Sequence, residues 1–125
     1  MPGKGQKQVK WHKDVEDDDF EAAESYLSLI YTVKRSRRFV AALRKARPAR
    51  FKAKDIFRAS QLSRLGVSNL RVKRDRQKIK EGIALDPILL VRDQANGKVV
   101  VADGYHRLCA VYEVNEDVWI PCRIV

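Results

Sequence analysis

The sequence predicts an α+β fold, and three observations support this. Apolar residues recur every three or four positions along residues 17–46, which is the spacing of one face of a helix. Two short apolar runs, 88–91 and 99–101, are separated by an Asn-Gly pair, which favours a tight turn between antiparallel strands. From residue 51 the expected order is strand, helix, strand, hairpin, strand, helix, strand, which adds a mixed sheet to the N-terminal helices.

Length and composition indicate one soluble domain. The 125 residues are 45% hydrophobic, and they contain no apolar run near the ~20 residues that span a bilayer. The polar, lysine-rich residues 1–14 predict a flexible tail rather than a signal peptide. Cys109 and Cys122 stand in apolar surroundings, which is typical of buried free thiols in a reducing compartment. We therefore expect a cytoplasmic protein with no membrane partner, and its oligomeric state stays open.

Residues 15–50 predict a helical extension made of two helices. The first helix begins at the aspartates 17–19, because acids favour the positive end of a helix dipole. Its expected apolar face consists of Phe20, Ala23, Leu27 and Ile30. The second helix is expected between a Thr32 N-cap and Ala46, before Pro48 ends the pattern. Its expected buried residues are Phe39, Val40 and Leu43.

Residues 51–125 predict the main domain. Short alternation over 51–59 suggests a strand that runs into a loop. A helix is expected over 70–81, with Ser68 or Asn69 as its N-cap. The remaining expected elements are a strand at 88–91, a hairpin to a strand at 99–101, a helix over 105–112 and a strand at 119–125.

The turn between the strand at 99–101 and the helix after it is the best candidate for a ligand site. Free backbone N–H groups at a helix N-terminus bind anions, and Gly104 permits the close approach of a phosphate. Arg107 adds a forked cationic donor, and His106 is the candidate catalytic residue because imidazole serves as acid or base. The alternative is a well-capped helix whose Arg107 pairs with Asp103 or Glu113. The residues alone leave both interpretations open.

Several spaced motifs over residues 51–125 resemble the ParB/sulfiredoxin superfamily. They are Leu85-Asp86-Pro87-Ile88-Leu89-Leu90-Val91, then Val101-Ala102-Asp103-Gly104-Tyr105-His106-Arg107-Leu108-Cys109-Ala110, and finally Ile120-Pro121-Cys122. The residues that match the Gly-x-x-Arg-x-x-Ala box of ParB proteins or the Gly-Cys-His-Arg segment of sulfiredoxins are Gly104, His106, Arg107 and Ala110. The resemblance implies a small mixed sheet with flanking helices. It also implies a nucleotide, with ATP or CTP and Mg²⁺ as the candidate cofactors, bound at Gly104, Tyr105, His106 and Arg107.

Departures from these families limit what the resemblance implies. Tyr105 stands where sulfiredoxins carry their reactive cysteine, so we do not expect sulfiredoxin chemistry. The helix-turn-helix region and dimerisation tail of ParB proteins are not recognisable, so we do not expect a partition protein. Asp103 is a candidate for orienting Arg107 or, more weakly, for holding magnesium through water.

The helix predicted at 70–81 carries a second set of cationic side chains. Arg71, Arg74 and Lys78 are spaced i, i+3 and i+7, so they share one face. The corresponding helix of sulfiredoxin-like proteins supplies polar groups to the nucleotide, which implies a nucleotide-binding role for these three residues. A basic face that is merely solvated is the alternative.

Charge is segregated along the chain. The net charge is +10, and residues 34–54 hold ten Lys or Arg and no acid. Such a block attracts the phosphates of nucleic acids, although it can equally be a solubilising surface. The candidate nucleic-acid-binding residues are Arg35, Arg37, Arg38 and Arg44.

Three functional hypotheses follow from the sequence. The first is a ParB-like nucleotide-binding or phosphate-binding domain, acting as a nucleotide-dependent switch or as a weak phosphohydrolase or phosphotransferase. The second is a DNA-binding or RNA-binding module that uses the basic N-terminal helix. The third is an interaction subunit that keeps the fold without a ligand.

Overall fold

The computed structural model describes residues 8–66 and 68–125, so the predicted tail is described only in part. In chain order the elements are α1 (Asp17–Leu27), α2 (Val33–Lys45), β1 (Ala49–Lys52), α3 (Ala53–Ser60), α4 (Leu70–Glu81), β2 (Ile88–Asp93), the short 3₁₀ helix η1 (Gln94–Asn96), β3 (Lys98–Asp103), α5 (Tyr105–Val114) and β4 (Trp119–Ile124). The α+β prediction is confirmed.

The four strands form one mixed sheet in the order β1-β4-β2-β3. β4 lies parallel to β2, with Ile88 opposite Cys122, and the two outer pairs are antiparallel. η1 joins β2 to β3 and ends at Gly97. The φ of Gly97 is 63°, a left-handed conformation that glycine adopts without strain and that is typical of Asn-Gly turns. The expected hairpin is therefore present.

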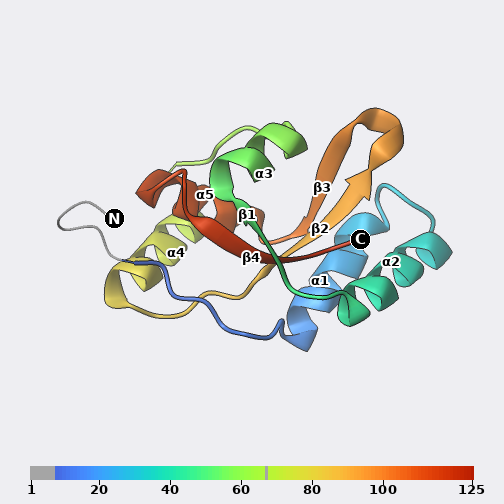
Figure 1. Ribbon diagram of the computed structural model, residues 1–125, viewed down its shortest axis with the longest axis horizontal. Coiled ribbons are helices and arrows are strands. Elements are labelled where there is room, and N and C mark those ends of the chain that lie inside the picture. Colours follow the sequence, from blue (N-terminus) through green and yellow to red (C-terminus); the bar gives the residue numbers. More distant parts are fainter. Residues whose placement is uncertain (1–7, 67) are drawn as a thin grey trace.

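The sheet is buried on both faces (Figure 1). Along β2, Leu89 and Val91 pack with α1 and α2, whereas Ile88 and Leu90 pack with residues of α3, α4 and α5. Alternate residues of a strand point to opposite faces, so a strand covered on both sides is apolar throughout. This explains the continuous apolar run that predicted β2.

The N-terminal helices belong to the same fold as the sheet. Phe20, Ala23 and Leu27 of α1 share a core cluster with Leu89 of β2 and Ala102 of β3. The division predicted at residue 50 therefore does not divide the core. α1 also ends earlier than its expected face, because the chain turns after Leu27 and leaves Ile30 48% exposed.

The segment after β1 corrects the sequence prediction. Residues 53–60 form helix α3, where a strand running into a loop was expected. The buried residues of α3 are Ala53, Ile56, Phe57 and Ser60. Their spacing of i, i+3, i+4 and i+7 is helical, and β1 covers only the first part of the region that seemed to alternate.

Side-chain caps explain where the predicted helices α2 and α4 begin. The Thr32 hydroxyl accepts a hydrogen bond from the backbone N–H of Arg35 at the start of α2. The Asn69 side chain accepts from the N–H groups of Arg71 and Val72 at the start of α4. Both caps are as predicted, so the helix boundaries are set by local chemistry.

Residues 8–12 pair with the chain after α4 instead of forming part of a free tail. Trp11 forms a parallel bridge with Leu85, whose backbone N–H donates to the carbonyl of Lys10 at 2.9 Å. Val9 is buried in the core formed by the sheet and helices α3 to α5. Apolar residues within a polar segment explain this correction.

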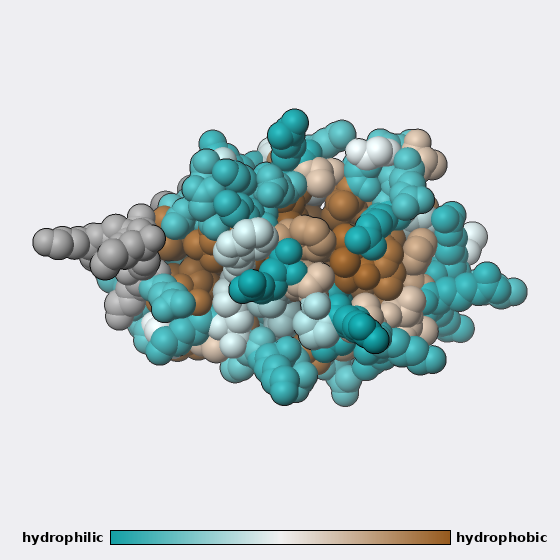
Figure 2. All heavy atoms as spheres, viewed as in Figure 1, coloured by the Kyte–Doolittle hydropathy of each residue, from teal (hydrophilic) through white to brown (hydrophobic). Residues whose placement is uncertain are grey.

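The face seen in Figure 2 is mostly hydrophilic, with a hydrophobic area at the left of the view and another beside the C-terminus. An apolar groove of about 210 Å³ lies in this region, between α3 and the β2–β3 hairpin. Its apolar lining consists of Phe51, Ile56, Ala59, Leu90, Val99 and Ile124. None of the helices in the described ranges has the length and apolar character needed to cross a bilayer.

Candidate functional site

A cleft of about 250 Å³ lies between α4 and the turn that leads from β3 into α5. Its lining residues are Arg71, Arg74, Asp75, Lys78, Asp103, Gly104, Tyr105, His106 and Arg107. The structure thus brings together all seven residues that the sequence predicted as nucleotide-binding. The two additional members are acids.

The α4 wall of the cleft supplies three cationic groups. Arg71, Arg74 and Lys78 have exposed side chains, and helical spacing puts them on one face. Val72 and Ile79 are buried on the other side of α4 and fix its orientation. The predicted division of this helix into a core face and a basic face is therefore confirmed.

The α5 wall supplies backbone donors. α5 begins directly after Gly104, and no side chain among the described residues caps it. The first N–H groups of a helix have no partner within the helix, so those at the start of α5 can donate to an anion. The helix dipole adds partial positive charge at the same place.

Gly104 is required by packing as well as by backbone conformation. Its φ is 103°, which residues with a side chain rarely adopt. A Cβ atom added there would lie 2.9 Å from Cγ1 of Ile88 and 3.0 Å from Nη2 of Arg107. The side of Gly104 that lacks a side chain is thus filled by the protein itself, so close approach of a phosphate is not needed to explain this glycine.

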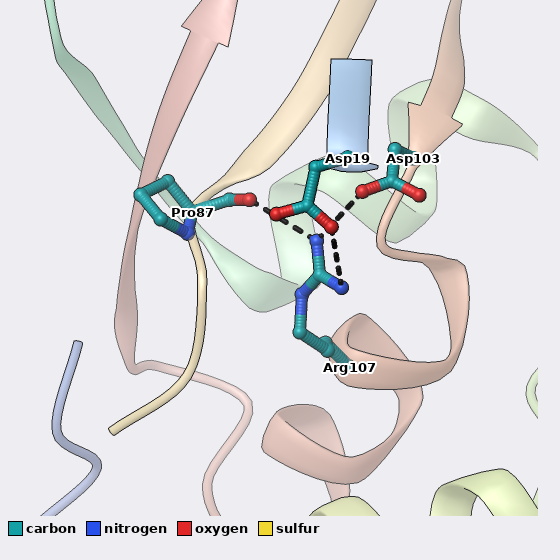
Figure 3. A network of polar contacts seen from close by, with 4 residues as sticks. All are labelled: Asp19, Pro87, Asp103 and Arg107. Carbon is teal, nitrogen blue, oxygen red and sulfur yellow. Dashed lines mark hydrogen bonds and ion pairs between the residues drawn. The ribbon is translucent and has the colours of Figure 1, made fainter. Parts of the chain in front are cut away.

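The Arg107 guanidinium is held by acceptors from three segments (Figure 3). Nη2 donates to Oδ2 of Asp103 at 3.0 Å and to the carbonyl of Pro87 at 3.1 Å. Nη1 forms an ion pair with Oδ1 of Asp19, at 3.8 Å. The pairing of Arg107 with Asp103 expected in the alternative interpretation is therefore present, whereas Glu113 pairs with Arg76 instead.

Asp19 brings α1 into contact with the turn before α5. Its side chain is 15% exposed, and its Oδ2 has no hydrogen-bond partner among the described residues. Burial raises the pKa of Asp19 to about 8, with the nearby carboxyl groups of Asp86 and Asp103 acting in the same direction and Arg107 opposing them. Two acids, Asp19 and Asp103, therefore share the guanidinium of Arg107, and Asp19 binds its proton more tightly than an exposed acid does.

Tyr105 contacts the loop after α3. Its hydroxyl donates to the carbonyl of Ser63, which ties α5 to the loop after α3. Cys109, one turn further along α5, is buried, and burial raises the pKa of its thiol. Cys122 is also buried and unpaired, so both cysteines are free thiols as predicted.

Two titratable side chains face the cations of the cleft. Burial and the charge of Arg71 lower the pKa of His106 below 6.5, while Asp75 opposes this. Burial also raises the pKa of Asp75, against the attraction of Arg107, Lys78, His106 and Arg71. The cleft thus contains a histidine that is harder to protonate than usual and an aspartate that is harder to ionise than usual, both beside positive charges.

No protein-family model, curated protein or solved structure matches this chain. The functional interpretation therefore rests on the geometry of the site.

Sequence analysis missed Asp19 and Asp75 as members of this region. Asp75 had a detectable signal, because it is the only acid within residues 71–80 and its spacing places it on the face of Arg71 and Lys78. Asp19 had none, since a first-turn aspartate is explained by the helix dipole alone. Only the tertiary packing of α1 against β3 brings Asp19 to Arg107.

The candidate nucleic-acid-binding residues lie on α2, away from the cleft. The Arg35 guanidinium lies over the rings of Tyr31 and Phe39, at 4.8 and 5.4 Å from their centres. Arg44 lies over the ring of Phe20 and donates to Asp17 at 2.9 Å. These two arginines therefore have intramolecular partners that the sequence did not indicate.

Arg37 and Arg38, the other two candidates, are exposed and form no ion pair with any described residue. They line different shallow hollows, Arg37 beside Glu21 and Glu24 and Arg38 beside Arg35. The structure thus separates the four candidates into two partnered and two solvated arginines.

Asp103, the weak candidate for magnesium, is engaged by Arg107. Across residues 8–66 and 68–125, no group of three or more His, Cys, Asp or Glu side chains is arranged to hold a metal ion. The contact of Asp103 with Arg107 therefore fits the role of orienting Arg107.

Proposed function

We propose that the chain binds the phosphate group of a small ligand, nucleotides foremost, in the cleft between α4 and α5. The observation that carries this proposal is the convergence of Arg71, Arg74 and Lys78 on the uncapped start of α5. Cationic side chains and free helix N–H groups are the two features that bind phosphate most often. His106, at the same place, is the candidate acid or base for any hydrolysis or transfer of that phosphate.

Arg107 has a supporting part in this proposal. Its guanidinium borders the cleft but is only 17% exposed and is already paired with Asp103 and Asp19. We assign direct phosphate contacts to the α4 cations and His106, and we assign Arg107 the task of holding the turn in place. The resemblance to the ParB/sulfiredoxin superfamily stays a prediction that the same experiment addresses.

Thermal denaturation of the full chain with ATP, CTP or GTP and Mg²⁺ tests the proposal. A ligand at 100 times its Kd stabilises a protein by about 2.7 kcal/mol, which for a chain of this size raises Tm by roughly 10 °C. Arg74→Ala should abolish most of the shift, because a charged hydrogen bond contributes about 1.5–3 kcal/mol.

The matched control is Lys73→Ala, since Lys73 is an exposed cation of the same helix that does not line the cleft. It should leave the shift unchanged. Absence of any shift with all three nucleotides and with inorganic phosphate would exclude the proposal, as would equal shifts for Arg74→Ala and the unmodified chain.

A second candidate function is nucleic-acid binding by the face of α2. The observation that favours it is the exposure of Arg37 and Arg38 without ion-pair partners among the described residues, within a stretch of 30 residues, 25–54, that contains no acid. Each neutralised phosphate releases counterions, so such binding weakens steeply with salt.

Fluorescence anisotropy with short DNA and RNA duplexes at 50 and 200 mM salt tests this second function. The double charge reversal Arg37→Glu and Arg38→Glu should abolish binding and leave nucleotide-induced stabilisation intact. Binding that is unaffected by salt, or that depends on Arg74 rather than on these two residues, would contradict it. If neither region binds its ligand, the hypothesis of a ligand-free interaction subunit remains.

A further inference from the structure

Asp75 is an acid placed among the cations of the proposed phosphate-binding cleft. It belongs to the face of α4 that also carries Arg71, Arg74 and Lys78. It is half-buried and lines the same cleft as these cations and His106. A carboxylate there reduces the attraction for a bare anion, so a phosphate site alone gives no reason for it.

The Asp75 carboxylate lacks an intramolecular partner. It makes no hydrogen bond and no ion pair within 4.0 Å with any other described residue. Three other acids near basic residues are paired: Asp103 with Arg107 at 3.0 Å, Glu113 with Arg76 at 3.1 Å and Asp117 with Lys54 at 2.7 Å. Neither oxygen of Asp75 is fully withdrawn from solvent, so both are open to a donor that enters the cleft. Asp75 is thus an acceptor whose partner is not supplied by the protein.

An ionised carboxylate only accepts hydrogen bonds, and its two oxygens can take two donors at once. Adjacent hydroxyl groups of a sugar present such a pair of donors. The cations of α4 and the N–H groups of α5 would bind the phosphate of the same molecule. The cleft measures about 250 Å³, which is slightly below the ~300–1,000 Å³ typical of drug-sized ligand pockets, so it suits a ligand of sugar-phosphate size.

We propose that the cleft selects phosphate monoesters that carry sugar hydroxyl groups, and that Asp75 recognises those hydroxyls. This inference rests on the proposed function and names its ligand class. The shared chemistry is a sugar phosphate, either free or as the ribose phosphate part of a nucleotide. A site built to hydrogen-bond a hydroxyl rejects analogues that lack it, because its polar group is then left unpaired.

Calorimetric titration of the full chain at pH 8 tests the inference. The probes are inorganic phosphate, ethyl phosphate, ribose 5-phosphate and AMP, which are all mainly dianionic at this pH. We expect ribose 5-phosphate to bind at least tenfold more tightly than ethyl phosphate. Asp75→Asn should remove most of this preference while ethyl phosphate binds as well as before or better, because one negative charge has gone.

The matched control is Glu81→Gln, which neutralises an exposed acid of α4 that does not line the cleft, and it should keep the preference. Equal affinities for AMP and ribose 5-phosphate would support a free sugar phosphate as the ligand, and tighter binding of AMP would support a nucleotide. Circular dichroism and Tm of each variant confirm that it is folded.

The outcomes separate the two proposals. If inorganic and ethyl phosphate bind but ribose 5-phosphate gains nothing, or if Asp75→Asn keeps the full preference, the inference about Asp75 is wrong and the phosphate site stands. If none of the four probes binds, both proposals are wrong.

Discussion

Two basic regions of this molecule differ in what surrounds their charges. The α2 surface, made of Lys34, Arg35, Arg37, Arg38 and Arg44, is part of the more strongly charged segment of the sequence. On it Arg35 and Arg44 stack on aromatic rings, Arg44 also pairs with Asp17, and the others extend into solvent. The cleft has fewer cations, but they converge on one volume beside the start of α5.

For binding a small anion, the convergence of cationic side chains on one site matters more than their number. Exposed cations on a convex helix are solvated individually and screened by salt, so each contributes little to binding a small ligand. Cations that line a concave site act on one phosphate together, and the low-dielectric walls focus their field. We therefore rank the cleft above the α2 surface as the functional region.

The largest expected effect concerns Arg107, whose ion pair holds the turn beside the cleft in place. Arg107→Ala should lower the free energy of unfolding by about 3 kcal/mol, because it leaves the partly buried Asp103 without its counter-charge. Arg38→Ala on the α2 surface should change it by less than about 0.5 kcal/mol. Urea denaturation of both variants measures the difference, and similar small effects would show that Arg107 is free to move.

A smaller effect tests the turn that carries the cleft. Gly104→Ala should destabilise the fold by about 2 kcal/mol, since the added Cβ would meet Cγ1 of Ile88 at 2.9 Å and the φ is positive. Gly97→Ala is the matched control, because its φ is also positive but no atom lies within 4 Å of the added Cβ. It should cost about 1 kcal/mol, as strain alone does. Equal losses of stability would show that packing at Gly104 is not tight.

The comparison of regions also explains which features were predictable from sequence. Helices α2 and α4 were predicted with their caps, because Thr32 and Asn69 act on backbone groups within three residues. The cleft residues were found partly from local patterns, helical spacing and a strand-to-helix glycine, and the nucleotide-binding role of the α4 cations came from the family resemblance. α3 was missed because it follows β1 without a side-chain cap at Lys52 and spans only eight residues.

Non-local contacts set the limit of sequence analysis. Asp19 and Arg107 are separated by 88 positions, and nothing in either neighbourhood indicates their ion pair. The same holds for the stacking of Arg44 on Phe20. From the sequence alone, Arg44 had no recognisable intramolecular partner. Counting charges therefore overestimated the α2 surface, since sequence does not distinguish a partnered arginine from a solvated one.

The contact of α1 with the cleft region gives a pH-dependent prediction. The pKa of Asp19 is raised from 3.8 to about 8, so the stability associated with its protonated form is present at low pH and is lost as the pH rises through about 8. Between pH 7 and pH 9 the unmodified chain should lose about 1 kcal/mol more stability than Asp19→Asn, which cannot ionise. Urea denaturation at both pH values measures this. Parallel losses in the two proteins would mean that Asp19 is already ionised at pH 7.

The smallest expected effect is a change of anion affinity with pH, which distinguishes the cleft, where His106 lies, from the α2 surface. The pKa of His106 lies below 6.5 because of burial and Arg71, and an anion bound beside it would favour its protonated form. Binding should then take up a proton, so affinity should increase as the pH falls from 7.5 to 5.5. Sulfate is the suitable probe, because its own charge stays constant in this range. We expect an increase of about threefold.

His106→Gln should remove most of this increase, because the imidazole is then absent. The two histidines of the chain are His12 and His106, and the α2 surface contains neither. Sulfate held by the α2 arginines would therefore bind with an affinity that does not change over this pH range. If the sulfate affinity of the unmodified chain does not change with pH, the anion binds at α2 rather than in the cleft. If it changes with pH and His106→Gln removes the change, the anion binds at the start of α5.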